Sequence, residues 1–106
     1  MAKYLYEGRY SAEGIKGVLK EGGTGRRAAV EAALKGLGGK IESMYYAFGE
    51  TDVYVIVDAP DNVTAAAIGM GIASTGTVGL KTTVLLTVDE IDEAGKKTLT
   101  FRASGH

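Results

Sequence analysis

The sequence predicts one α+β domain in which the elements follow one another as strand, helix, strand, strand, helix, strand. Residues 40–60 read as two strands joined by a tight turn at 48–52, and the second strand, Val53–Val57, is a nearly continuous apolar block. On either side of this pair, apolar residues recur at the i, i+3, i+4 spacing of an amphipathic helix. A chain of 106 residues suits a single domain of this kind.

The composition excludes several classes of function. Twelve basic and thirteen acidic residues leave a net charge of -1, so we expect no nucleic-acid binding. The chain contains no cysteine, which excludes disulfides, thiol catalysis and thiolate metal sites. No apolar run approaches the roughly 20 residues that span a bilayer, and the N-terminal segment lacks the apolar core of a signal peptide. We therefore expect a cytoplasmic protein without a membrane partner.

The first half of the chain predicts a strand followed by a broken helix. Alternation over residues 3–10 places the tyrosines of this strand on one face. Ser11 then offers a helix cap, and apolar residues at helical spacing continue as far as Gly22. Thr24 can cap a second helical piece, which ends near Gly38.

The second half predicts a helix over residues 61–74 and a strand over residues 77–88. The helix is rich in alanine and glycine, which let a helix axis lie close to a sheet or to another helix. We therefore expect close packing at Ala67, so that Ala67→Leu costs about 1–3 kcal/mol through overpacking. Residues 1–90 then form the domain, and residues 91–106 form a polar tail that is suited to docking on a neighbouring subunit.

Right-handed crossovers restrict how these strands pair. We expect strand 3–10 beside strand 53–57, and strand 77–88 beside strand 40–48, in an antiparallel ferredoxin-like βαββαβ sheet with the helices on one face. The other face would be bare in a monomer. Pairing of two sheets face to face would cover it, so the sequence predicts a homodimer of the dimeric α/β barrel kind, which can assemble further.

A set of short segments gives the chain a family resemblance. The segments are Arg26-Arg27-Ala28, Gly38-Gly39-Lys40, Tyr45–Phe48, Gly49-Glu50-Thr51-Asp52, Val53–Val57, Pro60-Asp61-Asn62, Leu85-Leu86-Thr87 and Phe101-Arg102-Ala103. Together they resemble the GYD-domain family, which is small and mostly uncharacterised. The resemblance implies a ferredoxin-like fold and a dimeric α/β barrel. Gly49 and Asp52 match the Gly, Tyr and Asp cluster that names the family, whereas Thr51 stands where the tyrosine would be.

The turn Gly49-Glu50-Thr51-Asp52 supports two interpretations. In a hairpin turn, Gly49 supplies an unusual backbone angle and Asp52 accepts hydrogen bonds from local amides, so neither residue needs a further role. In the alternative, Asp52 stands at the mouth of a ligand cavity as an acid or base. A cofactor-independent monooxygenase or isomerase of the dimeric α/β barrel group would use Asp52 or Tyr10 as its proton donor or acceptor.

The segment Glu21–Arg27 also has two interpretations. Free amides at a helix start and two guanidiniums suit a phosphate or carboxylate, which makes Arg26 a candidate ligand-binding residue. The segment lacks the spacing and the terminal Lys-Ser/Thr of a nucleotide-binding loop. A helix breaker followed by solvated arginines is the commoner arrangement.

Five tyrosines are candidates for the wall of a ligand cleft, because small-molecule pockets combine aromatic walls with few polar groups. Tyrosines at strand spacing are equally typical of a core or an interface. The five are Tyr6, Tyr10, Tyr45, Tyr46 and Tyr54.

These patterns predict a GYD-type homo-oligomer that binds a modest organic molecule or an anion and uses no cofactor. A cofactor-independent enzyme is the first alternative, and a structural or regulatory assembly module is the second. His106 is the only histidine, so we expect neither a histidine-based catalytic triad nor a metal site.

Overall fold

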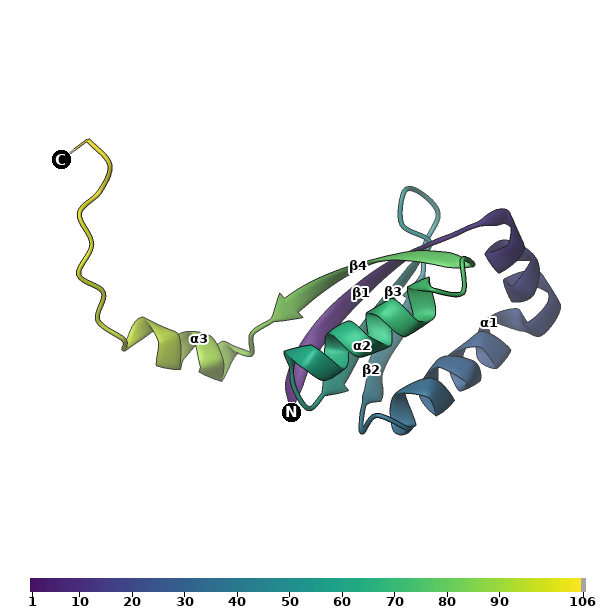
Figure 1. Ribbon diagram of the computed structural model, residues 1–106, viewed down its shortest axis with the longest axis horizontal. Helices are drawn as coiled ribbons and strands as arrows, with labels where there is room; N and C mark the ends of the chain where they lie inside the picture. The colour runs from purple at the N-terminus through teal and green to yellow at the C-terminus, as the bar shows by residue number, and fades with distance from the viewer. Residues whose placement is uncertain (106) are drawn as a thin grey trace.

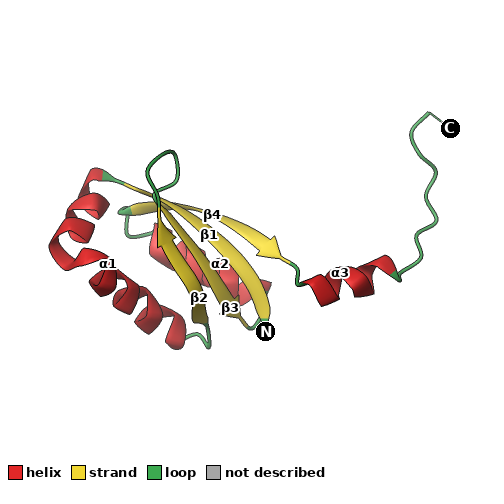
Figure 2. Ribbon diagram, turned by 180° about the vertical axis from the view of Figure 1, so that it is seen from behind, coloured by secondary structure: helices red, strands yellow, loops and turns green. Residues whose placement is uncertain are grey.

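The protein folds into one antiparallel four-stranded sheet with two helices on the same face (Figures 1 and 2). The computed structural model describes residues 1–105, and His106 lies outside them. The elements are β1 (Ala2–Tyr10), α1 (Ala12–Lys35), β2 (Lys40–Tyr46), β3 (Val53–Ala59), α2 (Asn62–Ala73), β4 (Val78–Leu85) and α3 (Val88–Gly95). The predicted α+β class and ferredoxin-like order of elements are confirmed, and α3 follows β4.

The strand order is β2-β3-β1-β4. The expected pairing of β1 with β3 is confirmed, but the expected pairing of β4 with β2 is wrong. Instead β4 pairs with β1, in a register that places Tyr6 opposite Thr82. Each crossover helix joins two parallel strands with one strand between them, so β1 and β3 become central. In the β2–β3 hairpin, β2 pairs with the outer edge of β3. The only central edge left for β4 is the outer edge of β1.

The core lies between the sheet and the two covering helices. On β3, Val53, Val55 and Val57 are all buried, so this set of side chains faces the helices. On β1, Tyr4 and Tyr6 are buried, and their hydroxyls hold α2 in place. Tyr4 donates to the Asn62 side-chain oxygen at 2.6 Å, and Tyr6 donates to the carbonyl of Ala65.

Helix α1 is broken, as predicted. Ser11 caps its start by accepting a hydrogen bond from the Gly14 amide at 3.2 Å. Gly22 interrupts the helix with φ 75° and ψ 167°, which is a backbone region that essentially only glycine occupies. The second half continues to Lys35, and Gly38, with φ 75°, then turns the chain toward β2.

The small residues of α2 face two different environments. Asp61 caps the helix by accepting a hydrogen bond from the Thr64 amide at 2.8 Å. Ala65 is buried against the sheet, whereas Ala67 is exposed between α2 and α1. The close packing expected at Ala67 is therefore wrong, because the Ala67 side chain is exposed on the side of α2 that faces α1.

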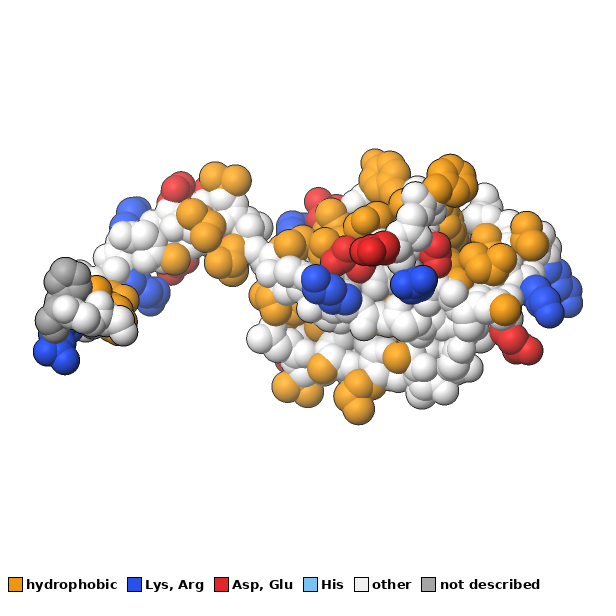
Figure 3. All heavy atoms as spheres, turned by 90° about the horizontal axis from the view of Figure 1, so that it is seen from above, with side chains coloured by type: hydrophobic (Ala, Val, Ile, Leu, Met, Phe, Trp, Pro, Cys, Tyr) orange, Lys and Arg blue, Asp and Glu red, His pale blue; other side chains and the backbone are white. Residues whose placement is uncertain are grey.

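The C-terminal part forms an arm that projects from the body (Figure 1). Strand β4 stops at Leu85, earlier than predicted, because Thr87 starts α3 with a reciprocal capping box to Glu90. The arm lengthens the molecule to 57 Å and raises its radius of gyration to 16.9 Å, against about 13 Å for a compact chain of this size. Hydrophobic side chains stand out on the arm as well as on the body (Figure 3).

Candidate functional site

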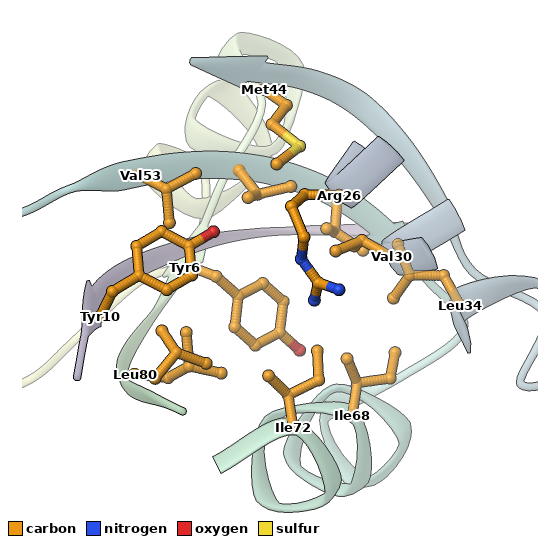
Figure 4. Close-up of a pocket in the computed structure, with 13 residues that line it drawn as sticks. Tyr6, Tyr10, Arg26, Val30, Leu34, Met44, Val53, Ile68, Ile72 and Leu80 are labelled. Carbon is orange, nitrogen blue, oxygen red and sulfur yellow. The ribbon is translucent and has the colours of Figure 1, made fainter. Parts of the chain in front are cut away.

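A small apolar cavity lies between the sheet and the helices, and we call it the sheet cavity (Figure 4). Its volume is about 60 Å³, which is room for a few water molecules or for one end of a ligand. Tyr6 and Tyr10 of β1 form part of its wall, and Arg26 of α1 reaches into it. Aliphatic side chains from α1, α2, β3 and β4 supply most of the remainder, together with Met44 of β2.

A wider groove runs between α1 and α2, and we call it the helix groove. It forms because the two helices pack on the sheet with few contacts to each other. Small residues border it on both sides, namely Ala29 and Ala33 of α1 with Ala67 and Gly71 of α2. Its volume is about 500 Å³, and it shares Arg26 and several aliphatic residues with the sheet cavity. The two spaces are therefore adjacent, and Arg26 lies in the lining of both.

Arg26 brings the only permanent charge to the lining of both spaces among the described residues. Its guanidinium points inward, toward Tyr6 and the aliphatic residues of α2 (Figure 4). One nitrogen, Nη1, lies 3.2 Å from Oε2 of Glu21. Arg27, the next residue, instead pairs with Glu31 through a regular i, i+4 contact of 2.8 Å. The two adjacent arginines therefore have different roles, and only Arg26 reaches the site.

Tyr6 and Tyr10 are the polar groups of the cavity wall contributed by β1. Tyr6 already donates its hydroxyl to Ala65, and burial raises its pKa. Burial is also the main cause that raises the pKa of Tyr10 to about 12, with a further contribution from the phenol of Tyr46. Both phenols are therefore protonated at neutral pH, which suits hydrogen-bond donation and not proton abstraction.

Asp52 lies outside the lining of the sheet cavity and helps to hold the β2–β3 connection. Its Oδ2 accepts a hydrogen bond from the Tyr10 amide at 2.8 Å, and its own amide donates to the Gly8 carbonyl at 2.8 Å. The Asp52 carbonyl also accepts from the Ala47 amide at 2.8 Å. Two details of the turn interpretation differ from the structure: the amide that donates to the Asp52 side chain belongs to β1 and is not local, and Gly49 is not among the glycines with positive φ.

The other three candidate tyrosines point elsewhere. Tyr45 and Tyr54 are cross-strand partners on the face of the sheet opposite the helices, and 70% and 37% of their surfaces are exposed. Tyr46 lines a surface pocket beside the β2–β3 connection, together with Tyr10 and Asp52. Sequence reasoning had missed the helical part of the lining, for example Val30 and Ile68, although their helical spacing was a usable signal.

The open face of the sheet, which the helices leave uncovered, combines apolar residues with a charge cluster. Leu5 and Ile56 are register partners on this face and are half-buried. Lys3 bridges Asp58 at 2.8 Å and Glu42 at 3.1 Å, and its hydrogen bonds to these two carboxylates raise its pKa. This face therefore carries charged as well as apolar side chains.

The sheet order and the helices on one face place the chain in the class of ferredoxin-like α+β proteins. Residues 4–94 match the GYD domain, and the chain belongs to that family. The segment 101–103, which also contributed to the resemblance, lies beyond the matched range. Neither a curated protein nor a solved structure matches the chain.

Residues 1–105 contain neither a membrane-spanning helix nor a cluster of metal ligands. No helix in this part of the chain is long and apolar enough to cross a membrane. Within the same residues, no group of three or more His, Asp or Glu side chains could hold a metal ion.

Proposed function

We propose that the protein is a homo-oligomer that binds a small organic molecule in the sheet cavity and the helix groove. The observation that supports this most directly is the space between α1 and α2. Its volume of about 500 Å³ falls within the usual range of small-molecule sites, and it opens onto an apolar floor. Helices with small facing residues would normally approach each other, so a preserved gap at this place favours an occupant.

The ionisable groups favour binding over proton-transfer chemistry. Among the described residues that line the sheet cavity, only Arg26, Tyr6 and Tyr10 can titrate. Arginine stays charged, and burial raises the pKa of both tyrosines, so none of the three is suited to act as a base at neutral pH. Asp52 is engaged with the Tyr10 amide. These features support a ligand-binding role before an enzymatic one.

A titration with 1-hexanol tests this proposal, followed by the methyl NMR signals of Ile68 and Ile72. We expect saturable shifts at both residues, which line both spaces. Ala67→Leu should remove them, because a leucine would fill the groove from an exposed position. Ala66→Leu is the matched control, since Ala66 is also exposed but faces the side of α2 over β4. Equal shifts in the two variants, or no saturable shift in the wild type, would rule out this site.

The homodimer forms through the open face of the sheet. Leu5 and Ile56 would be covered there by the same face of a second copy, an isologous arrangement. The exposed Ile91 and Phe101 of the arm would extend the contact onto the partner.

Sedimentation velocity at micromolar concentration should show a dimer or a larger species. Ile56→Glu should shift this species toward monomer, because it places a charge in the centre of the interface. Val63→Glu, at an 80% exposed position on α2, should leave the assembly unchanged. A monomeric wild type would refute the proposed assembly.

A further inference from the structure

We propose that the ligand is a monocarboxylate with an apolar body, and that Arg26 binds its carboxylate. This inference rests on the proposed binding function and specifies the chemical class of the ligand. It follows from the hydrogen-bonding groups that face the site, from the break in α1, and from the residues that line the two adjacent spaces.

Some polar groups that face the site lack a full set of hydrogen-bond partners, and these groups are donors. Arg26 makes one hydrogen bond among the described residues, to Glu21, and a guanidinium carries several further N–H groups. Tyr10 adds a phenol to the same wall, but this phenol already interacts with that of Tyr46, so Arg26 is the main donor that faces the site. In the groove, the Thr75 hydroxyl is within hydrogen-bonding distance of the Ile72 carbonyl and of the Thr77 hydroxyl. Both threonine hydroxyls therefore already have a partner within the protein. A ligand that complements this site must therefore present an acceptor, preferably a charged one.

The contact between Glu21 and Arg26 shows which chemistry the guanidinium accepts at this position. These residues are five apart, whereas side chains that meet on a regular helix are three or four apart. The break at Gly22 makes the contact possible, and Gly25 leaves room for Glu21, whose Cβ lies 3.1 Å from the position of an added Cβ. The Glu21 carboxylate thus stands in for a ligand carboxylate beside the site.

Exchange of one carboxylate for another is energetically easy here. The Glu21 side chain is 45% exposed and can return to water, since such surface pairs contribute little stability. A ligand carboxylate that approaches from the groove would meet the inward side of the same guanidinium, where the surroundings are apolar and charge-assisted hydrogen bonds are stronger. The two carboxylates would then share one guanidinium and repel each other, so Glu21 weakens ligand binding.

The remainder of the site suits an aliphatic or aromatic body of modest size. Arg26 borders two spaces that could hold the body of a ligand. One is the sheet cavity, and the other is the helix groove, which Ala33 and Ala67 also line. Neither path offers a second cation among the described lining residues. A single anionic group with an uncharged body is therefore the matching ligand, and a dianion would leave one charge without a partner.

Hexanoate and 1-hexanol form a matched pair of probes for this proposal, because they share chain length and differ in the anionic group. By calorimetry or methyl NMR at neutral pH, we expect hexanoate to bind at least about tenfold more tightly than 1-hexanol. Arg26→Gln should abolish this preference. Arg27→Gln should preserve it, because Arg27 pairs with Glu31 outside the site. Glu21→Gln should raise hexanoate affinity by up to about fivefold, since a competing carboxylate is removed.

The outcomes separate this proposal from the one on which it rests. If both probes bind equally well and Ala67→Leu blocks both, the site is a ligand site but the assignment of a carboxylate is wrong. If Arg26→Gln and Arg27→Gln weaken hexanoate equally, the attraction is a general surface charge effect and Arg26 is not the anchor. If neither probe shifts Ile68 or Ile72, both proposals fail together.

Discussion

The start of α1 packs so closely on the chain before β4 that one methyl group should destabilise the fold. A Cβ added at Gly14 would lie 2.1 Å from the Thr77 carbonyl oxygen and 2.8 Å from the Tyr10 ring. The same oxygen accepts hydrogen bonds from the Ser11 amide at 2.9 Å and from the Ser11 hydroxyl at 3.2 Å. Because the obstacle is backbone, the helix end must move by roughly 1 Å, and these hydrogen bonds lengthen or break.

The magnitude follows from three contributions. Overpacking costs about 1–3 kcal/mol, and each weakened hydrogen bond costs about 1 kcal/mol. Against these, alanine in place of glycine in a helix gains about 1 kcal/mol. With two hydrogen bonds weakened, we therefore expect Gly14→Ala to lower the free energy of unfolding by about 2–4 kcal/mol and the melting temperature by roughly 10–15 °C.

Gly17→Ala is the matched control, since Gly17 lies in the same helical piece and an added Cβ there meets nothing within 4 Å. It should raise the free energy of unfolding by about 0.5–1 kcal/mol. Thermal and urea unfolding followed by circular dichroism measure both variants. If Gly14→Ala proves as stable as Gly17→Ala, the packing of the Gly14 backbone on Thr77 is not as described.

Three further predictions concern stability. Asp61→Ala should lower the urea midpoint of unfolding at neutral pH, through loss of the α2 cap. The hydrogen bonds from Thr64 lower the Asp61 pKa below its ordinary 3.8, so the stability that the carboxylate contributes is lost as the pH falls through the lowered value. Asp61→Asn should therefore lose less stability than the wild type at acid pH. The pKa of Lys3 is raised above 10.5, so its pairing with Asp58 stabilises the fold below that pH and is lost as the pH rises through the raised value. Lys3→Met should therefore show a weaker alkaline dependence of stability, and an unchanged dependence would contradict the pairing. Gly22→Ala should cost about 1–3 kcal/mol, because alanine does not tolerate φ 75° with ψ 167°, and a melting temperature like that of Gly17→Ala would show that the helix break can be removed.

The sequence was informative about the elements and less so about their neighbours. The break at Gly22 and the helix start at Asp61 were readable because glycine and cap residues act locally. The partner of β4 was misjudged, because a crossover can skip a strand without leaving a signal in the local pattern. Likewise, the lack of contact at Ala67 depends on where α1 lies, which no residue of α2 encodes.

The residues of the candidate site also differ in how well the sequence predicts them. Tyr6 and Tyr10 line the cavity because the alternation of β1 puts them on the buried face, and this face could be recognised from the sequence. Tyr54 lies on the opposite face because the three valines of β3 point inward, and the sequence left that choice open. One signal was available, since Asp58 shares the face of Tyr54 and a carboxylate there argues against the apolar side.

Stability and binding are connected through the wall that Tyr10 forms. A Cβ at Gly14 would press on the Tyr10 ring, which lines the sheet cavity, so Gly14→Ala should weaken ligand binding as well as the fold. A ligand that binds only the folded state adds about 2.7 kcal/mol of stability at a concentration of 100 times its dissociation constant. Saturating hexanoate should therefore raise the melting temperature of Gly17→Ala as much as that of the wild type, and that of Gly14→Ala by less. Equal increases in the two variants would show that the Gly14 contact acts on the fold alone and leaves the cavity wall in place.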